Sequence, residues 1–466
     1  MTGRGTAAQG EKRVIPNSSQ LFPMDIRRAK GPESLVNPGF QAVIHLSPAP
    51  TNTTKIYILL LLRRKGGRRA VPGVGAEGTG LLQSNHKGDD EMHFRVQTDE
   101  INYSLGMVTR AIAARPIKQV YDGVLIETTD DALVLTCTDG EISIKAKVNA
   151  IVEEDGCALL PAKLFAEMMR KQPAGEVDVR IDDRMWALIR SRGSNTSMAC
   201  MAAEDFPDIR DVMGENVVNL PCKRLRDAIS RVLFAVSTDE SRKILTGILM
   251  KVHPSETLMV GLDGFRLALQ RIEAENQLPA SAPKGQISAV VPGRILGEVS
   301  KMLPDSDDMA QIVFNSSHVM YSFGPVRVYA TLLTGEFIDY QKILPTTWTT
   351  EVMVMRSQFS DSIDRCSLMA REGKNNLIYL HLQPTGVMEM TANAERGDVH
   401  EELDIGFEGN ALNIAFNSRY LTDIIHNIDG ERIRMCFNSN VSPCMILPIE
   451  GNEFTFLVLP VRIFGK

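Results

Sequence analysis

Three ten-residue stretches, spaced about 125 residues apart, decide the fold. They read Pro161-Ala-Lys-Leu-Phe-Ala-Glu-Met-Met-Arg170, Pro292-Gly-Arg-Ile-Leu-Gly-Glu-Val-Ser-Lys301 and Asn417-Ser-Arg-Tyr-Leu-Thr-Asp-Ile-Ile-His426, and they align without gaps. Self-similarity at a fixed spacing is typical of a chain built from repeated structural units. We therefore expect three tandem copies of one unit in this protein.

Each stretch has the pattern of an amphipathic helix. Apolar residues recur at helical spacing and should face the core, as Leu164, Phe165 and Met168 do in the first stretch. The opposite face carries a basic, an acidic and a basic residue at i, i+4 and i+7. We name this pattern the charged stripe, and its members are Lys163, Glu167 and Arg170, then Arg294, Glu298 and Lys301, then Arg419, Asp423 and His426.

A second amphipathic helix opens each copy, with apolar residues at i, i+4, i+7 and i+11. These residues are Ile101, Leu105, Val108 and Ile112, then Leu225, Ile229, Val232 and Val236, then Phe359, Ile363, Cys366 and Ala370. Short apolar or alternating runs between the helices predict strands. The unit is therefore of the α+β class, with two helices covering one face of a largely antiparallel sheet. Tandem repetition of such a unit gives an open array or a closed ring.

The chain divides into a leader and a patterned body. Residues 1–91 show no sustained period and are expected to be a disordered or misassigned N-terminal extension. The body is expected to hold three domains, at residues 92–213, 214–346 and 347–466. Residues 1–91 carry 13 Lys/Arg and 7 Asp/Glu, whereas residues 92–466 carry 38 and 50.

Within this acidic body, basic charge gathers on the helices. The segment from Cys222 to Val236, for example, holds four basic residues and one acidic residue. A cationic face that recurs in each repeat suits a repeating anionic ligand, and duplex DNA offers about one negative charge per 1.7 Å of its axis. No helix-turn-helix, zinc finger or RNA-binding aromatic motif is recognisable, so we expect contact with the DNA backbone and no reading of sequence.

Other classes of protein are disfavoured. The longest apolar run, Ile56 to Leu62, is far shorter than the roughly 20 residues of a membrane span. Seven scattered cysteines without zinc spacing, and no secretory signal, favour the cytoplasm. No nucleotide-binding, hydrolase or metalloprotease motif is present, and we expect no cofactor and no metal site.

From Met92 onward the chain resembles the bacterial sliding clamp, the β subunit of DNA polymerase III. The resemblance is carried by Thr138-Asp-Gly140, Glu204-Asp-Phe-Pro-Asp208, Gly261-Leu-Asp-Gly-Phe-Arg-Leu-Ala268, Gly335-Glu-Phe-Ile-Asp-Tyr340 with Leu344-Pro345, Phe416-Asn-Ser-Arg-Tyr420 and Val458-Leu-Pro-Val-Arg-Ile463. It implies the DNA clamp fold and a head-to-tail homodimer that forms a ring around double-stranded DNA. Such a ring is a processivity factor in DNA replication. We therefore expect an accessory subunit without catalytic activity, and any DNA-directed DNA polymerase activity would belong to the holoenzyme that it serves.

The resemblance also implies two sets of site residues. Those expected to face DNA, together with the charged stripes, are Arg115, Lys163, Arg170, Arg224, Arg231, Arg242, Arg294, Lys301, Arg365 and Arg419. A partner-peptide groove between the second and third repeats is expected to involve Leu245, Leu262, Gly264, Phe265, Arg266, Leu267, Pro345, Asn417, Tyr420, Val441, Leu459, Pro460, Val461 and Arg462. The implied partners are the clamp loader, the catalytic subunit of the replicative polymerase, and other polymerases or repair proteins that carry short linear motifs.

Three features depart from the family pattern. Phe265 stands where the family often has His, Asn375 replaces an aromatic residue, and Phe464-Gly-Lys466 extends past the usual end. They bear on which partners the groove prefers.

Two rival hypotheses remain at this point. In one, the chain is a nuclease in which Asp139 and Asp263 hold Mg²⁺, although their equivalent places in different repeats keep them from sharing one ion. In the other, the chain is a scaffold that binds peptides and never encloses DNA.

Overall fold

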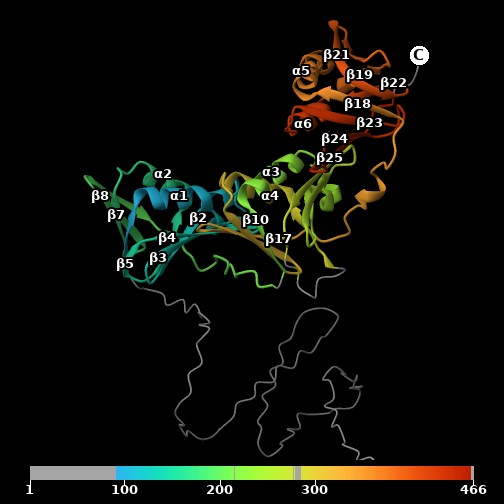
Figure 1. Cartoon of the computed structure of the whole chain (residues 1–466). Coiled ribbons are helices and arrows are strands. Elements are labelled where there is room, and N and C mark those ends of the chain that lie inside the picture. The colour runs from blue at the N-terminus through green and yellow to red at the C-terminus, as the bar shows by residue number, and fades with distance from the viewer. Residues whose placement is uncertain (1–90, 215, 277, 279–284, 463–466) are drawn as a thin grey trace, which may run out of the picture. The chain divides into compact units, whose positions relative to one another are not determined.

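The computed structural model describes residues 91–462, except residues 215, 277 and 279–284. All of the expected leader but Glu91 lies outside the described residues, as does Phe464-Gly-Lys466. The α+β prediction is confirmed, and each repeat follows the plan strand, helix, four strands, helix, three strands (Figure 1).

The first repeat differs from this plan only by an additional short strand, β5. Its elements are β1 (Met92–Gln97), α1 (Thr98–Val108), β2 (Gly123–Thr129), β3 (Ala132–Thr138), β4 (Ile142–Asn149), β5 (Ile151–Glu154), β6 (Cys157–Pro161), α2 (Ala162–Arg170), β7 (Glu176–Ile181), β8 (Trp186–Ser191) and β9 (Ser194–Ala199).

The second and third repeats contain ten elements each. Those of the second are β10 (Asn216–Pro221), α3 (Cys222–Leu233), β11 (Gly247–Val252), β12 (Glu256–Leu262), β13 (Arg266–Glu273), β14 (Ile287–Pro292), α4 (Gly293–Met302), β15 (Met309–Phe314), β16 (His318–Phe323) and β17 (Val326–Thr331). Those of the third are β18 (Thr350–Met355), α5 (Arg356–Glu372), β19 (Leu377–Leu382), β20 (Val387–Ala394), β21 (Gly397–Gly409), β22 (Leu412–Asn417), α6 (Ser418–Ile425), β23 (Arg432–Phe437), β24 (Cys444–Pro448) and β25 (Phe454–Val458).

The helices begin directly where a strand ends. Pro161, Pro221 and Pro292 occupy the N-cap positions of α2, α3 and α4, with φ of −58°, −58° and −54°. Proline is tolerated there because a helix start leaves its backbone N–H groups without intrahelical partners. In α6 the cap is Asn417, whose side-chain oxygen accepts a hydrogen bond from the Arg419 backbone N–H at 3.0 Å.

Helix pairs α1 and α2, α3 and α4, and α5 and α6 pack within their own repeats against antiparallel strands (Figure 1). The principal apolar core runs through all three repeats and includes the fully buried Phe94, Phe165, Phe314 and Phe359. One expectation was wrong: Leu164 was assigned to the core but is 51% exposed. The buried face of α2 instead centres on Phe165, Ala166 and Met169, which leaves Leu164 one position to the side.

Sheets continue from one repeat into the next. β4 of the first repeat pairs with β17 of the second, within an eight-stranded sheet. β13 of the second repeat pairs with β25 of the third, within a twelve-stranded sheet. The repeats are therefore joined by backbone hydrogen bonds, and this same pairing positions the predicted groove.

Candidate peptide groove and nucleic-acid interface

A second apolar cluster lies at the junction of the second and third repeats. Of the predicted groove residues, Leu245, Leu262 and Leu267 belong to it and are 2–3% exposed, and the partly buried Leu459 packs against it. The sequence prediction missed other members of the cluster: Leu249, Val260, Leu269, Val290, Tyr340, Cys436, Met445 and Leu457. The missed signal is that β13 is apolar on both faces, since Leu267 and Leu269 serve this cluster while Ala268 and Ile272 serve the principal core.

A tight turn presents Phe265 above this cluster. The Asp263 carboxylate accepts hydrogen bonds from the backbone N–H groups of Phe265 and Arg266, at 2.8 and 3.0 Å. Gly264 has φ +95°, a conformation that residues with a side chain rarely adopt. Phe265 is 54% exposed, and its ring stacks on that of Tyr420 with centroids 5.9 Å apart.

Arg266 joins the two repeats. Its side chain is only 9% exposed and pairs with Asp263 at 3.1 Å and with Asp423 of α6 at 2.5 Å. Its guanidinium lies 5.3 Å from the Phe234 ring centroid and 4.8 Å from that of Tyr420. Arg266 therefore fixes the wall of the groove, and its donors are engaged by these carboxylates.

Residues 459–462, which follow β25, continue the wall beside Phe265. The Leu459 backbone N–H donates to the Phe265 carbonyl and the Val461 N–H donates to the Ala415 carbonyl, both at 2.8 Å. Pro460 and Val461 are half-buried and Arg462 is exposed. Pro345 is half-buried, and Val441 is 54% exposed in the turn between β23 and β24.

The predicted DNA-facing residues fall into two groups. Six pair with carboxylates: Lys163 with Asp122, Arg231 with Asp429, Arg242 with Asp239, Arg294 with Asp139 and Glu141, Lys301 with Glu298, and Arg365 with Glu401. Arg115, Arg170 and Arg419 are exposed and form no ion pair within the described residues, and Arg224 donates to the Glu273 carbonyl at 3.3 Å. The pairs of Lys163 with Asp122 and of Arg242 with Asp239 are exposed on both sides, and such exposed ion pairs contribute only about 0–1 kcal/mol.

The stripe on α4 also takes part in the junction between the first and second repeats. Arg294 of α4 lies 2.9 Å from both Asp139 and Glu141, and Arg110 donates to Glu298 at 3.2 Å. Partial burial lowers the pKa of Arg294, but the ion pairs and hydrogen bonds with Asp139 and Glu141 together outweigh it, and the net shift is upward. Likewise burial opposes ionisation of Glu298, yet the hydrogen bonds from Lys301 and Arg110 lower its pKa overall.

Arg242 lies beside the groove. It donates to the Asp263 carbonyl at 3.2 Å, and its guanidinium would lie 3.2 Å from a Cβ added at Gly264.

The acids of the nuclease hypothesis accept backbone hydrogen bonds within their own turns. Asp139, for example, accepts from the Glu141 and Ile142 N–H groups at 2.9 Å. Among the described residues, no group of three or more His, Cys, Asp and Glu is placed to hold a metal ion.

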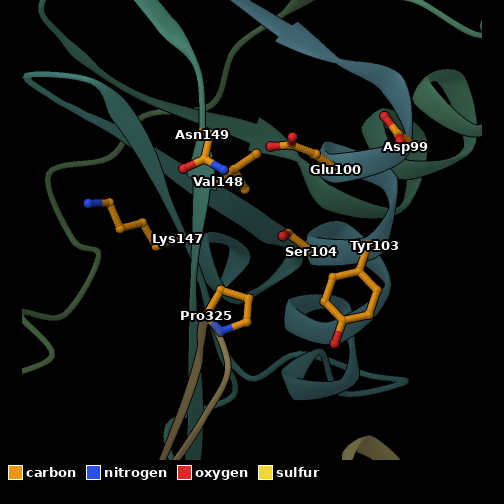
Figure 2. A pocket seen from close by; sticks show the side chains of 8 residues that line it. All are labelled: Asp99, Glu100, Tyr103, Ser104, Lys147, Val148, Asn149 and Pro325. Carbon is orange, nitrogen blue, oxygen red and sulfur yellow. The ribbon is translucent and has the colours of Figure 1, made fainter. Parts of the chain in front are cut away.

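A different set of residues lines a cavity of about 460 Å³ (Figure 2). Asp99, Glu100, Tyr103 and Ser104 project from α1, and Lys147, Val148 and Asn149 lie on β4, where the Lys147 backbone N–H donates to the Pro325 carbonyl at 3.0 Å. None of the predicted site residues lines this cavity. Because α1 contains Asp99 and Glu100 and no Lys or Arg, Lys147 is the one basic residue among those that line the cavity.

No helix in the described part of the chain is long and apolar enough to cross a membrane.

Comparison with known proteins gives one consistent answer. Residues 92–210, 219–339 and 341–462 match the N-terminal, central and C-terminal domain families of the DNA polymerase III beta subunit. The beta sliding clamp of Bacillus subtilis is 31% identical over 383 residues, which cover 80% of this chain and 100% of the relative. The chain belongs to the bacterial beta sliding clamp family.

Solved sliding clamps have the same fold. The B. subtilis clamp structure superimposes with a TM-score of 0.77 at 30% identity, and the DNA polymerase III beta subunit of Thermotoga maritima with 0.74 at 25% identity. Each alignment covers 80% of this chain and 100% of the other. As a sliding clamp, the chain is a DNA polymerase processivity factor, a non-catalytic accessory subunit with DNA and a polymerase as its partners.

Proposed function

We propose that two copies of this chain close head to tail into a ring that encircles duplex DNA, and that the groove between the second and third repeats captures short peptides of replication proteins. The observation that carries this proposal is the way the repeats are joined. Strand pairing, exposed apolar side chains and the distribution of charge each support it.

Both junctions inside the chain follow one rule: the strand after the turn at Asp139 or Asp263 pairs with the last strand of the next repeat. These pairs are β4 with β17 and β13 with β25. The same rule would pair β21 of the third repeat with β9 of the first. Among the described residues, β9 pairs only with β8, and Gly397 to Asp404 of β21 pair only with β20.

Unpaired strand edges are templates for pairing with another chain. We infer that β21 of one copy pairs with β9 of a second copy, and a twofold axis then forms the reciprocal junction and closes the ring. The internal junctions also give the register. There the facing pairs are Ile144 with Val328 and Ala268 with Phe456, whose equivalents in the third junction are Val399 and Thr196.

Apolar side chains support the same surface. Leu368 of α5 is equivalent to Phe234, and Leu164 of α2 is equivalent to Tyr420, and these two aromatic residues meet around Arg266 at the junction of the second and third repeats. Leu368 and Leu164 are 67% and 51% exposed. Contact between them across two copies accounts for both exposures.

DNA contact would come from the stripe residues that keep a free guanidinium, above all Arg170 of α2 and Arg419 of α6. Weak contacts of this kind are tolerant of sliding because every phosphate is equivalent. Retention on DNA then depends on closure of the ring.

In the groove, we propose that the stacked Phe265 and Tyr420 and the partly buried Leu459 contact the apolar anchors of a peptide, which supply most of the binding energy. Val441, Pro460 and Arg462 form its rim. The buried Leu245, Leu262 and Leu267 support the floor.

We also propose a cytoplasmic location, which agrees with seven free cysteines.

The test is retention on nicked circular DNA after incubation with a clamp loader and ATP. We expect the protein to stay bound in about 0.5 M salt, where phosphate contacts alone are weak, and to be lost once the DNA is cut at one site. Equal retention on both forms, or loss from both, would support the scaffold hypothesis instead.

A further inference from the structure

We propose a second peptide-docking site, on the first repeat, that accepts an apolar anchor flanked by basic residues. It rests on the proposed function, because its occupant would be a short segment of a protein that works on the ring. A cavity of about 610 Å³ marks it, between the segment around Val120 and the turn that holds Glu204 and Asp205.

The apolar cluster that contains Val120, a residue of the cavity lining, repeats the positions of the cluster at the groove in the second repeat. Leu125 and Leu249 are the third residues of β2 and β11, and Leu159 and Val290 each stand two residues before a helix-capping proline. These residues belong to two separate apolar clusters, one in each repeat. Phe206 and Phe337 pack against the respective clusters, and both follow an acidic residue.

Backbone hydrogen bonds fix the segment 201–206 beside the cavity. The Met201 N–H donates to the Leu159 carbonyl at 2.7 Å, and the Phe206 N–H donates to the Ala203 carbonyl at 2.9 Å. Val120 is 9% exposed and Met201 is half-buried, so an incoming side chain meets an apolar surface that is already formed. The flexible thioether of Met201 adapts to anchors of different shape.

Charge selects the occupant. Glu204 and Asp205 are both exposed on the rim, and neither forms an ion pair within the described residues. The one basic residue that lines the cavity, Lys118, places its amine 5.9 Å from the Tyr121 ring centroid. In the second repeat, by contrast, Arg242 and Arg266 along the groove are paired with carboxylates, Arg242 with Asp239 and Arg266 with Asp263 and Asp423. Basic flanks should therefore favour the site on the first repeat, whereas the apolar anchor directs a peptide to the groove in the second repeat.

The experiment uses two fluorescein-labelled heptapeptides, GKRLLFG and GEDLLFG, titrated into the full chain and followed by anisotropy. The double variant Glu204→Gln/Asp205→Gln should weaken binding of the basic peptide about five- to tenfold, as expected for two exposed charge pairs. Met201→Asp should abolish the same binding by placing a charge in the apolar floor. Neither change should affect the acidic peptide.

The matched control is Tyr420→Ala, which alters the groove in the second repeat. It should weaken the acidic peptide and spare the basic one. If Tyr420→Ala removes both peptides, or if the Glu204/Asp205 double variant binds the basic peptide as the native chain does, the second site does not exist. Retention of these variants on nicked circular DNA reports separately on the proposed function, which can stand while the second site fails.

Discussion

Replacing Leu368 by Ala should weaken the proposed dimer without destabilising the subunit. Full burial of a leucine side chain contributes about 1.5–3 kcal/mol. Leu368 is 67% exposed in the single chain, so closing a junction over it would contribute about 1–2 kcal/mol. A ring contains two such junctions, and the loss of both corresponds to about a 30- to 700-fold rise in the dimer dissociation constant.

Sedimentation equilibrium measures this constant, since the monomer has a mass of 51.5 kDa and the dimer twice that. Thermal unfolding of the monomer should hardly change, because an exposed side chain contributes little to the packing of its own subunit. Met213→Ala is the matched control, since Met213 is 81% exposed and lies outside the proposed junction. A dimer constant that is the same in the native chain, the variant and the control would refute the assignment of this surface.

Three further predictions concern the stripes, the internal junction and the groove. Removing Arg170 and Arg419 together should make DNA binding less sensitive to salt. The slope of log K against log salt concentration, measured by titration at several salt concentrations, should become shallower by about 0.9 for each phosphate that is no longer neutralised. An unchanged slope would exclude both residues from the interface. Glu298 has a lowered pKa, so its ion pairs stabilise the fold above its unfolded pKa of about 4.3 and are lost as the pH falls through its folded pKa. In urea titrations Glu298→Gln should therefore cost about 1 kcal/mol at pH 7 and progressively less below pH 4.3, whereas a cost independent of pH would contradict the pairing. Tyr420→Ala should weaken a groove-binding peptide about tenfold in anisotropy titrations, because it loses the stacking on Phe265, and native affinity would show that this ring is no part of the groove.

The repeat pattern allowed most of the fold to be predicted. Helices α2, α4 and α6 begin and end within two residues of the stretches that predicted them, because strong amphipathic periodicity and capping residues fix helices locally. The predicted ends of two other helices were wrong. Ile112 and Val236 continue the apolar spacing, yet α1 ends at Val108 and α3 at Leu233, since the chain there turns toward the next strand.

The candidate sites were less predictable because they depend on contacts between repeats. The sequence indicated a charged stripe in each repeat, but it did not reveal that Arg294 pairs with Asp139 across a junction. Nor did it indicate that Arg266 pairs with Asp423, which lies 157 residues away. Partners so distant in the chain are set by sheet pairing between repeats, which leaves no local periodic signal.

The most direct test of ring closure is a register-specific cross-link made on DNA. Thr196→Cys and Val399→Cys, in a chain that also carries Cys157→Ser and Cys200→Ser, place two thiols on residues that should face each other between copies. Directly facing strand residues have Cα atoms about 4.5–5.5 Å apart, within the range of a disulfide, whereas the next residue along a strand directs its side chain to the opposite face of the sheet. The off-register control therefore combines Asn195→Cys with Val399→Cys.

The reduced protein is loaded on nicked circular DNA, oxidised and treated with detergent. Our account predicts a covalently closed dimer that stays linked to the circle, that is released by a single cut in the DNA, and that the control does not form. Cross-linked protein that leaves the intact circle in detergent, or a control that closes equally well, would contradict it.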